Sequence, residues 1–131
     1  MKKILGIAFA TILLSSCSQT PSVIGTWRLD SVTMDGQEIP IDDCKKKSIV
    51  IFQDGGKAVI HSFYEIPENK ECKEVISEKN FTISGNTIKS IDKNKHEDEE
   101  KYTIKGDTLC LEKVFISQGK NVTVTTKLLK Q

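Results

Sequence analysis

The sequence is poor in the side chains on which most active sites depend. It has two histidines and four cysteines, and it contains no Gly-x-Ser-x-Gly, His-Glu-x-x-His or glycine-rich phosphate-binding motif. Its 19 basic and 18 acidic residues nearly balance, and no block is basic enough to indicate nucleic-acid binding. We therefore expect a non-enzymatic protein that needs no cofactor and binds no nucleic acid.

The sequence has one long apolar run, which is too short to cross a membrane as a helix. It covers 4–14 and follows Lys2 and Lys3, as in a secretory signal peptide, whereas a spanning helix needs about 20 apolar residues. The run ends in Leu-Ser-Ser-Cys at 14–17, which resembles the bacterial lipobox. The resemblance implies a signal peptide over 1–16, cleavage before Cys17 and attachment of acyl chains such as palmitate to that cysteine.

Several acyl chains on Cys17 would hold the protein on a membrane. Each buried methylene contributes about 0.8 kcal/mol, and a single chain binds only reversibly. Residues 17–22 would then be the acylated cysteine and a flexible tether. Ser18 stands where an aspartate commonly retains lipoproteins in the inner membrane, and no acidic run follows to direct export to the cell surface. We expect a lipid-anchored protein of the Gram-negative outer membrane, on its periplasmic face.

The other three cysteines indicate one disulfide, because the periplasm is oxidising. Cys44 and Cys72 lie in polar segments that we expect to be loops. Pairing them closes a loop of about 29 residues and stabilises the fold by roughly 3–4 kcal/mol. Cys110 lies in a strand-like segment, where we expect a free, packed thiol. Metal binding or thiol catalysis is the alternative, but the cysteines are much further apart than the close pairs of zinc sites.

The remainder of the chain, 23–131, is predicted to be one domain of β-strands. Eight segments rich in β-branched and aromatic residues alternate with short turns that contain Gly, Asn or Asp. They cover 23–32, 47–53, 57–65, 74–83, 86–91, 100–105, 108–116 and 121–130. Sequential hairpins must hide their sheet edges, so we expect an all-β, eight-stranded antiparallel up-and-down barrel. Two stacked sheets are the alternative.

Successive residues of a strand face opposite sides of the sheet, so one set should line the barrel interior. We expect that set to be Trp27, Leu29, Ile49, Ile51, Val59, His61, Phe63, Phe81, Ile83, Tyr102, Ile104, Leu109 and Leu111. The set is bulky and its strands are short, which predicts a mostly filled interior. If a cavity exists, the best candidates for a ligand-binding lining are His61, Phe63, Tyr64 and Tyr102.

Gly25-Thr26-Trp27 opens the first predicted strand and resembles the first lipocalin motif, Gly-x-Trp. With the lipobox, the two loop cysteines and the "SGNT" and "KGDT" turns, residues 23–130 are similar to the lipocalin-like domains of many small bacterial lipoproteins. The resemblance implies that Trp27 plugs the closed end of the barrel beneath a basic side chain. Arg28 faces the other side of the strand, so Lys127 or Lys130 would be the basic partner.

The two histidines are the candidates for general bases near neutral pH. His61 shares the predicted face of Val59 and Phe63, where it is either a hydrogen-bonded core residue or a polar group in a cavity. His96 lies in a mixed-charge loop and precedes the carboxylates Glu97, Asp98, Glu99 and Glu100. Consecutive carboxylates on a loop seldom converge on one cation. We therefore expect no catalytic residue and no metal site.

Two functions remain open from the sequence. The resemblance implies a binding module, since an eight-stranded barrel is just wide enough for one small ligand, which would be mostly apolar. A filled interior instead favours a structural or interaction lipoprotein. Such a protein would present loops 34–46, 65–73 and 92–100 to an envelope protein, for example as an inhibitor. The volume of the interior cavity distinguishes the two.

Overall fold

The computed structural model describes residues 22–131, so the predicted signal peptide, Cys17 and the tether up to residue 21 lie outside the described residues. The strands are β1 (Gly25–Met34), β2 (Gln37–Ile39), β3 (Ile49–Gln53), β4 (Lys57–Glu65), β5 (Cys72–Ser84), β6 (Thr87–Asp92), β7 (Glu97–Lys105), β8 (Thr108–Ser117) and β9 (Lys120–Lys130). A short 3₁₀ helix, η1 (Lys45–Lys47), precedes β3. Among these residues, no helix has the length and apolar character needed to cross a membrane.

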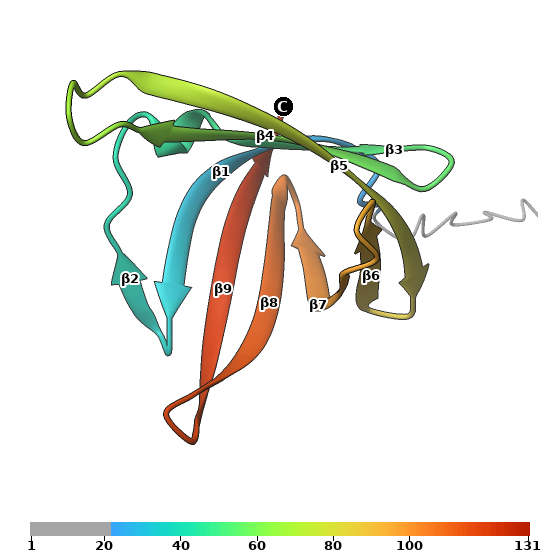
Figure 1. Ribbon diagram of the computed structural model, residues 1–131. Helices are drawn as coiled ribbons and strands as arrows, with labels where there is room; N and C mark the ends of the chain where they lie inside the picture. The colour runs from blue at the N-terminus through green and yellow to red at the C-terminus, as the bar shows by residue number, and fades with distance from the viewer. Residues whose placement is uncertain (1–21) are drawn as a thin grey trace, which may run out of the picture.

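Eight of the nine strands close into an antiparallel barrel. Neighbours pair in the order β1-β3-β4-β5-β6-β7-β8-β9, and β9 pairs back with β1. The predicted barrel is confirmed, and the alternative of two stacked sheets is wrong. The sequence interpretation missed β2, which pairs only with β1 and is too short, at 3 residues, to show an alternating pattern. In Figure 1, β4 and β5 cross above the wall formed by β1, β9, β8, β7 and β6.

Short turns that contain glycine join several pairs of neighbouring strands, among them β1–β2 and β3–β4. Asp35 and Gly36 both have positive φ, at 50° and 81°, as a two-residue hairpin turn requires. Gly56 carries a further constraint, because a Cβ there would lie 2.9 Å from the backbone oxygen of Phe81. The N–H of Phe81 donates to the carbonyl oxygen of Gly56 at 2.7 Å. Glycine at position 56 therefore lets the β3–β4 turn approach the backbone of β5 closely.

The buried core lies where β1 begins and β9 ends. Trp27 is 1% exposed and Leu109 is fully buried. The rest of this cluster is Val23, Phe52, Ala58, Phe81, Ile88 and Leu128. The indole Nε1 of Trp27 donates a hydrogen bond to the carbonyl oxygen of Val23 at 2.7 Å, so the polar atom of the ring is satisfied inside the core.

The inward faces of β3 and β4 are displaced by one residue from the prediction. Phe52 and Ala58 are buried and Val50 packs against the core, so the even-numbered residues face the interior. The predicted inward residues that instead belong to the outer face are Ile49, Ile51, Val59, His61 and Phe63. Both faces of β3 are apolar, so hydrophobicity cannot choose between them. The register with β1, which places Val50 opposite Trp27, decides the orientation.

On the other strands the predicted inward residues have the expected parity. Trp27, Leu29, Phe81 and Leu109 are buried. The predicted residues that pack against the core from partly buried positions are Tyr102, Ile104 and Leu111. Ile83 is paired with Ile88 near the end of β5 and keeps 43% of its surface exposed.

The predicted disulfide between Cys44 and Cys72 is present, with 5.6 Å between the two Cα atoms. Cys44 is buried immediately before η1, and Cys72 is the first residue of β5 rather than part of a loop. The bond therefore ties the segment before β3 to the β4–β5 hairpin. Cys110 is a free, half-buried thiol, on the opposite face of β8 from the buried Leu109.

Candidate functional site

The barrel interior holds a cavity of about 260 Å³ beside β1, β3, β4 and β9, which we call the main compartment. Its lining is Leu29, Lys45, Ser48, Ile49, Val50, Ile60, Ser62, Phe63, Tyr64, Leu111, Thr126 and Leu128. Ile49 and Phe63 border it although they have outward parity on β3 and β4. Most of the lining side chains are apolar, with a few hydroxyls among them. A mostly apolar wall with few polar groups is characteristic of small-molecule sites.

A smaller cavity of about 80 Å³ lies toward β5, β6 and β7, and we call it the inner compartment. Val50, Ile60 and Leu111 line both compartments. The other residues of its wall are Phe52, Ala58, Lys79, Phe81, Ile88, Ser90 and Glu100. Side chains therefore fill the interior around Trp27, as the sequence predicts, but they leave space in the remainder of the barrel.

Four charged side chains stand on inward-facing positions of β5, β7 and β8. We call Lys79, Asp98, Glu100 and Lys113 the charged cluster. The Lys113 ammonium forms an ion pair with Asp98, and the Lys79 Nζ lies 3.9 Å from the other oxygen of Asp98. The Lys113 Nζ also lies 5.0 Å from the centroid of the Phe115 ring, a cation–π arrangement. Asp98 is thus a carboxylate held between two ammonium groups.

Glu100 is the member of the charged cluster whose charge is least compensated. Burial raises the pKa of Glu100 above its ordinary value, and the nearby charge of Asp98 raises it further. Lys113 and Lys79 act in the opposite direction without reversing the shift in pKa. The cluster therefore presents an underpaired carboxyl group to the inner compartment.

Strand alternation brings these carboxylates into the barrel. The exposure of β7 alternates residue by residue from Glu97 to Lys105, so Asp98 and Glu100 share a face with Tyr102. The sequence interpretation starts this strand at residue 100 and assigns the preceding carboxylates to a solvated loop. Continuing the inward parity of Tyr102 back by two and four residues would have identified both of them.

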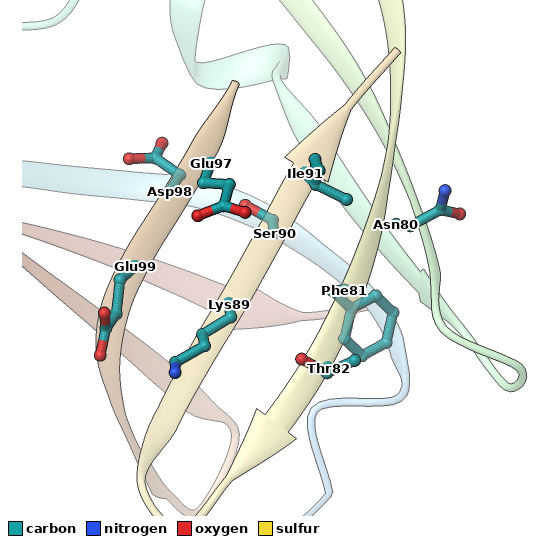
Figure 2. Close-up of a pocket in the computed structure, with 9 residues that line it drawn as sticks. All are labelled: Asn80, Phe81, Thr82, Lys89, Ser90, Ile91, Glu97, Asp98 and Glu99. Carbon is teal, nitrogen blue, oxygen red and sulfur yellow. The ribbon is translucent and has the colours of Figure 1, made fainter. Parts of the chain in front are cut away.

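A larger hollow, of about 560 Å³, lies elsewhere, against β5, β6 and β7. It is lined by three consecutive residues from each strand, 80–82, 89–91 and 97–99. Consecutive residues face opposite sides, so only the middle residue of each set, Phe81, Ser90 and Asp98, faces the interior, and most of the lining lies on the outer face. Figure 2 shows its side chains pointing in different directions, with Asn80 and Asp98 on opposite sides of the group. We therefore place the candidate site in the two interior compartments.

A sequence profile of the lipocalin-like domain matches residues 23–111. The match begins just before Gly25-Thr26-Trp27 and continues into β8. The chain belongs to the lipocalin-like domain family. No curated protein matches the sequence of this lipocalin-like domain.

Solved structures similar to this lipocalin-like domain include mammalian lipocalins. Bovine odorant-binding protein in complex with undecanal is 15% identical, with a TM-score of 0.48 over 82% of this chain and 70% of the other. The possum milk whey lipocalin trichosurin with bound 4-ethylphenol is 10% identical, with a TM-score of 0.47 over 80% and 73%. Aphrodisin from female hamster is 10% identical, with a TM-score of 0.44 over 84% and 76%.

Trp27 of the lipocalin-like domain belongs to the buried cluster where β1 begins and β9 ends. Of its two predicted basic partners, Lys130 is directly opposite Trp27 in the β1–β9 ladder, whereas Lys127 is opposite Ser31. Leu128 is buried, so Lys130 shares its face and Lys127 is on the other. Lys130 is therefore the lysine whose position matches the partner that the resemblance implied.

The four predicted lining residues fall in three different places. Tyr64 and Phe63 border the main compartment, and the Phe63 N–H donates to the Ser48 hydroxyl at 3.0 Å. His61 lies on the outer face, where its Nδ1 is 2.9 Å from Oε1 of Glu74. Tyr102 faces inward and packs against the core, and its hydroxyl donates to the carbonyl oxygen of Gly85 at 3.3 Å.

The segment around His96 builds the β6–β7 turn. The Asp92 carboxylate accepts the backbone N–H groups of His96 and Asn94 at 3.0 and 2.8 Å. The His96 bond is the main reason that the pKa of Asp92 is lowered. Within residues 22–131, no group of three or more histidine, cysteine or acidic side chains is placed to hold a metal ion.

Proposed function

We propose that this protein is a lipid-anchored lipocalin-like lipoprotein of the Gram-negative envelope that binds a small, mostly apolar ligand and catalyses no reaction. The observation that carries the proposal is the main compartment, an interior cavity of about 260 Å³ with a largely apolar wall. Family membership supports the same function. The residues that contact the ligand would be those of the main compartment, including Tyr64 and Thr126.

The size of the site limits the ligand. Typical small-molecule pockets measure about 300–1,000 Å³, so a main compartment of about 260 Å³ suits a molecule smaller than most cofactors. The affinity would come mainly from burial of apolar surface, at about 25 cal/mol for each Å² removed from water. A short alkyl chain or a single ring with one polar substituent meets both conditions.

The proposed cellular location rests on the lipobox that ends at Cys17 and on Ser18, the residue after that cysteine. Acylation at Cys17 would anchor the domain through the short tether, and Ser18 favours sorting to the outer membrane, with the domain on the periplasmic face. Native mass spectrometry of the protein taken from its own membranes tests both parts of the proposal. We expect a triacylated N-terminal Cys17 and a retained small molecule. An unacylated N-terminus would contradict the anchor.

Blocking the main compartment tests ligand binding directly. Thr126→Phe places a ring in the cavity, and Thr125→Phe is the matched control because the adjacent residue faces the outside of β9. We expect 1-octanol to bind the unmodified domain and to bind Thr126→Phe about tenfold more weakly, a loss of about 1.4 kcal/mol. Calorimetric titration measures both affinities. Equal affinities for the two variants would contradict binding in this cavity.

A second candidate function is an interaction lipoprotein that presents its surface to an envelope protein. The observation in its favour is an exposed apolar segment at the end of β8, where Val114, Phe115 and Ile116 are 56%, 44% and 80% exposed. Exposed apolar patches often mark protein contacts. The same mass-spectrometry experiment separates the candidates, because a retained protein without a small molecule would favour this function.

A further inference from the structure

The charged cluster distinguishes one wall of the ligand site from the others. Lys79, on β5, and Glu100, on β7, both line the inner compartment. Asp98 and Lys113 stand next to them on inward positions of β7 and β8. Charged side chains are seldom placed inside a barrel unless they are paired, because removing them from water costs free energy. The pairing within the cluster therefore determines which charge is available to a ligand.

Asp98 forms direct ion pairs and Glu100 forms none, although Lys113 and Lys79 are near enough to oppose the rise in the pKa of Glu100. Both lysines approach Asp98, Lys113 as an ion pair and Lys79 at 3.9 Å. Within residues 22–131, Glu100 takes part in no ion pair and no side-chain hydrogen bond. Burial and the charge of Asp98 also raise the pKa of Glu100, the response of a carboxyl group that lacks a partner.

We infer that the ligand is a small amphiphile with a basic amine head, which binds at Glu100 while its apolar tail occupies the main compartment. This inference rests on the proposed function and names the class of ligand. Val50, Ile60 and Leu111 border both compartments, so the two compartments adjoin at these residues, and the proposed ligand would extend past them from Glu100 to the main compartment. An ammonium head would supply the direct ion-pair partner that Glu100 lacks, through charge-assisted hydrogen bonds.

Other head groups fit this wall less well. A carboxylate head would meet Glu100 and Asp98, and the lysines that could attract it are already engaged with Asp98. Lys45 at the edge of the main compartment is exposed, so an ion pair there would be weakened by water and salt. A neutral alcohol would bury the carboxylate without neutralising it. The amine is the head group that lowers the free energy of Glu100.

Three ligands with the same tail test the inference: octylamine, 1-octanol and octanoate. The full mature chain carrying Cys17→Ser avoids the acyl chains without shortening the protein. We expect octylamine to bind about tenfold more tightly than 1-octanol in a calorimetric titration, and octanoate to bind most weakly. Glu100→Gln should remove the advantage of octylamine and leave the affinity for 1-octanol within about twofold.

Glu99→Gln is the matched control, because it removes the same charge from the adjacent outward position of β7. It should keep the full preference for octylamine. Chemical-shift titration of Glu100 in the unsubstituted protein gives an independent readout that needs no variant. Octylamine should lower the pKa of Glu100, because a bound ammonium stabilises the carboxylate.

The outcomes separate this inference from the proposed function. Equal binding of octylamine and 1-octanol overturns the amine head and leaves an apolar site in place. Tighter binding of octanoate also overturns it and assigns selection of the head group to the lysines. Binding of none of the three overturns the proposed function and this inference together. A preference for octylamine that survives in Glu100→Gln overturns the role of Glu100 and shows that another group selects the amine.

Discussion

The two ends of the barrel interior differ in what fills them. Around Trp27 the interior is apolar and tightly buried, and no polar or charged side chain of residues 22–131 is fully buried. Toward β5, β7 and β8 the interior holds four charged side chains beside a cavity. The ion-paired side chains Lys79, Asp98 and Lys113 keep 27–31% of their surface exposed, and ion pairs that reach solvent contribute only about 0–1 kcal/mol to stability. The Trp27 end therefore supplies the packed core, whereas the charged end is the part of the interior to which we assign ligand recognition.

Removing the Trp27 ring is the strongest test of the difference between the two ends of the interior. Trp27→Ala should lower the free energy of unfolding by about 3–5 kcal/mol, because it opens a cavity in the packed core. It also leaves the Val23 carbonyl oxygen without its indole donor. Denaturant unfolding measures the loss. Arg28→Ala, on the exposed adjacent position, should change stability by about 0.5 kcal/mol or less. Similar effects of the two substitutions would show that Trp27 is not central to stability.

The disulfide should have the next largest effect. Replacing both Cys44 and Cys72 with serine opens a loop with a sequence separation of 28. The free energy of unfolding should fall by about 3–4 kcal/mol in the chain-entropy model. Cys110→Ser is the control, because that thiol is free, and it should have a smaller effect in the same assay. Because Lys45 and Ser48 border the main compartment, 1-octanol binding should weaken in the double variant as well.

Two adjacent glycines test how closely the β3–β4 turn must approach β5. Gly55 and Gly56 both have positive φ, at 104° and 88°, but a Cβ would meet another atom within 4 Å only at Gly56. Alanine at either site should cost about 1–3 kcal/mol from backbone strain. Gly56→Ala should be the more destabilising in thermal unfolding because the Cβ would also contact the Phe81 carbonyl oxygen. Equal losses would exclude a role for that contact.

The strand order and the turns could be predicted because both depend on local chemistry. Glycine and aspartate or asparagine mark the turns, and β-branched residues mark the strands between them. The orientation of a strand could be predicted only where its two faces differ in hydrophobicity. On β1, Trp27 and Leu29 alternate with polar neighbours, so their orientation is clear. On β3 both faces are apolar, so the pairing of Val50 with Trp27 was needed to orient the strand.

The candidate site was harder to predict than the fold for a related reason. A charged sequence such as Glu97-Asp98-Glu99-Glu100 is typical of solvated loops, and composition alone does not show that alternate members face a cavity. His61 shows the opposite error, since the pattern places a single histidine among apolar residues in the interior, whereas it lies on the outer face beside Glu74. For His61 the register of neighbouring strands determined the outcome, whereas for the carboxylates it was the start of β7 at Glu97, three residues earlier than predicted.

The smallest expected effect tests the charged end. The pKa of Glu100 is raised in the folded protein, so the folded state holds this proton to higher pH than the unfolded chain does. The stability associated with Glu100 is therefore fully present below the pKa of the unfolded chain and is lost as pH rises through the raised pKa of the folded state. Glu100→Gln should thus be more stable than the unsubstituted protein at neutral pH and no more stable at acid pH. Denaturant unfolding from acid to neutral pH measures the difference in the free energy of unfolding, with Glu99→Gln as the control. If Glu100→Gln is instead less stable than the unsubstituted protein at neutral pH, the Glu100 carboxylate stabilises the folded state, and the prediction is wrong.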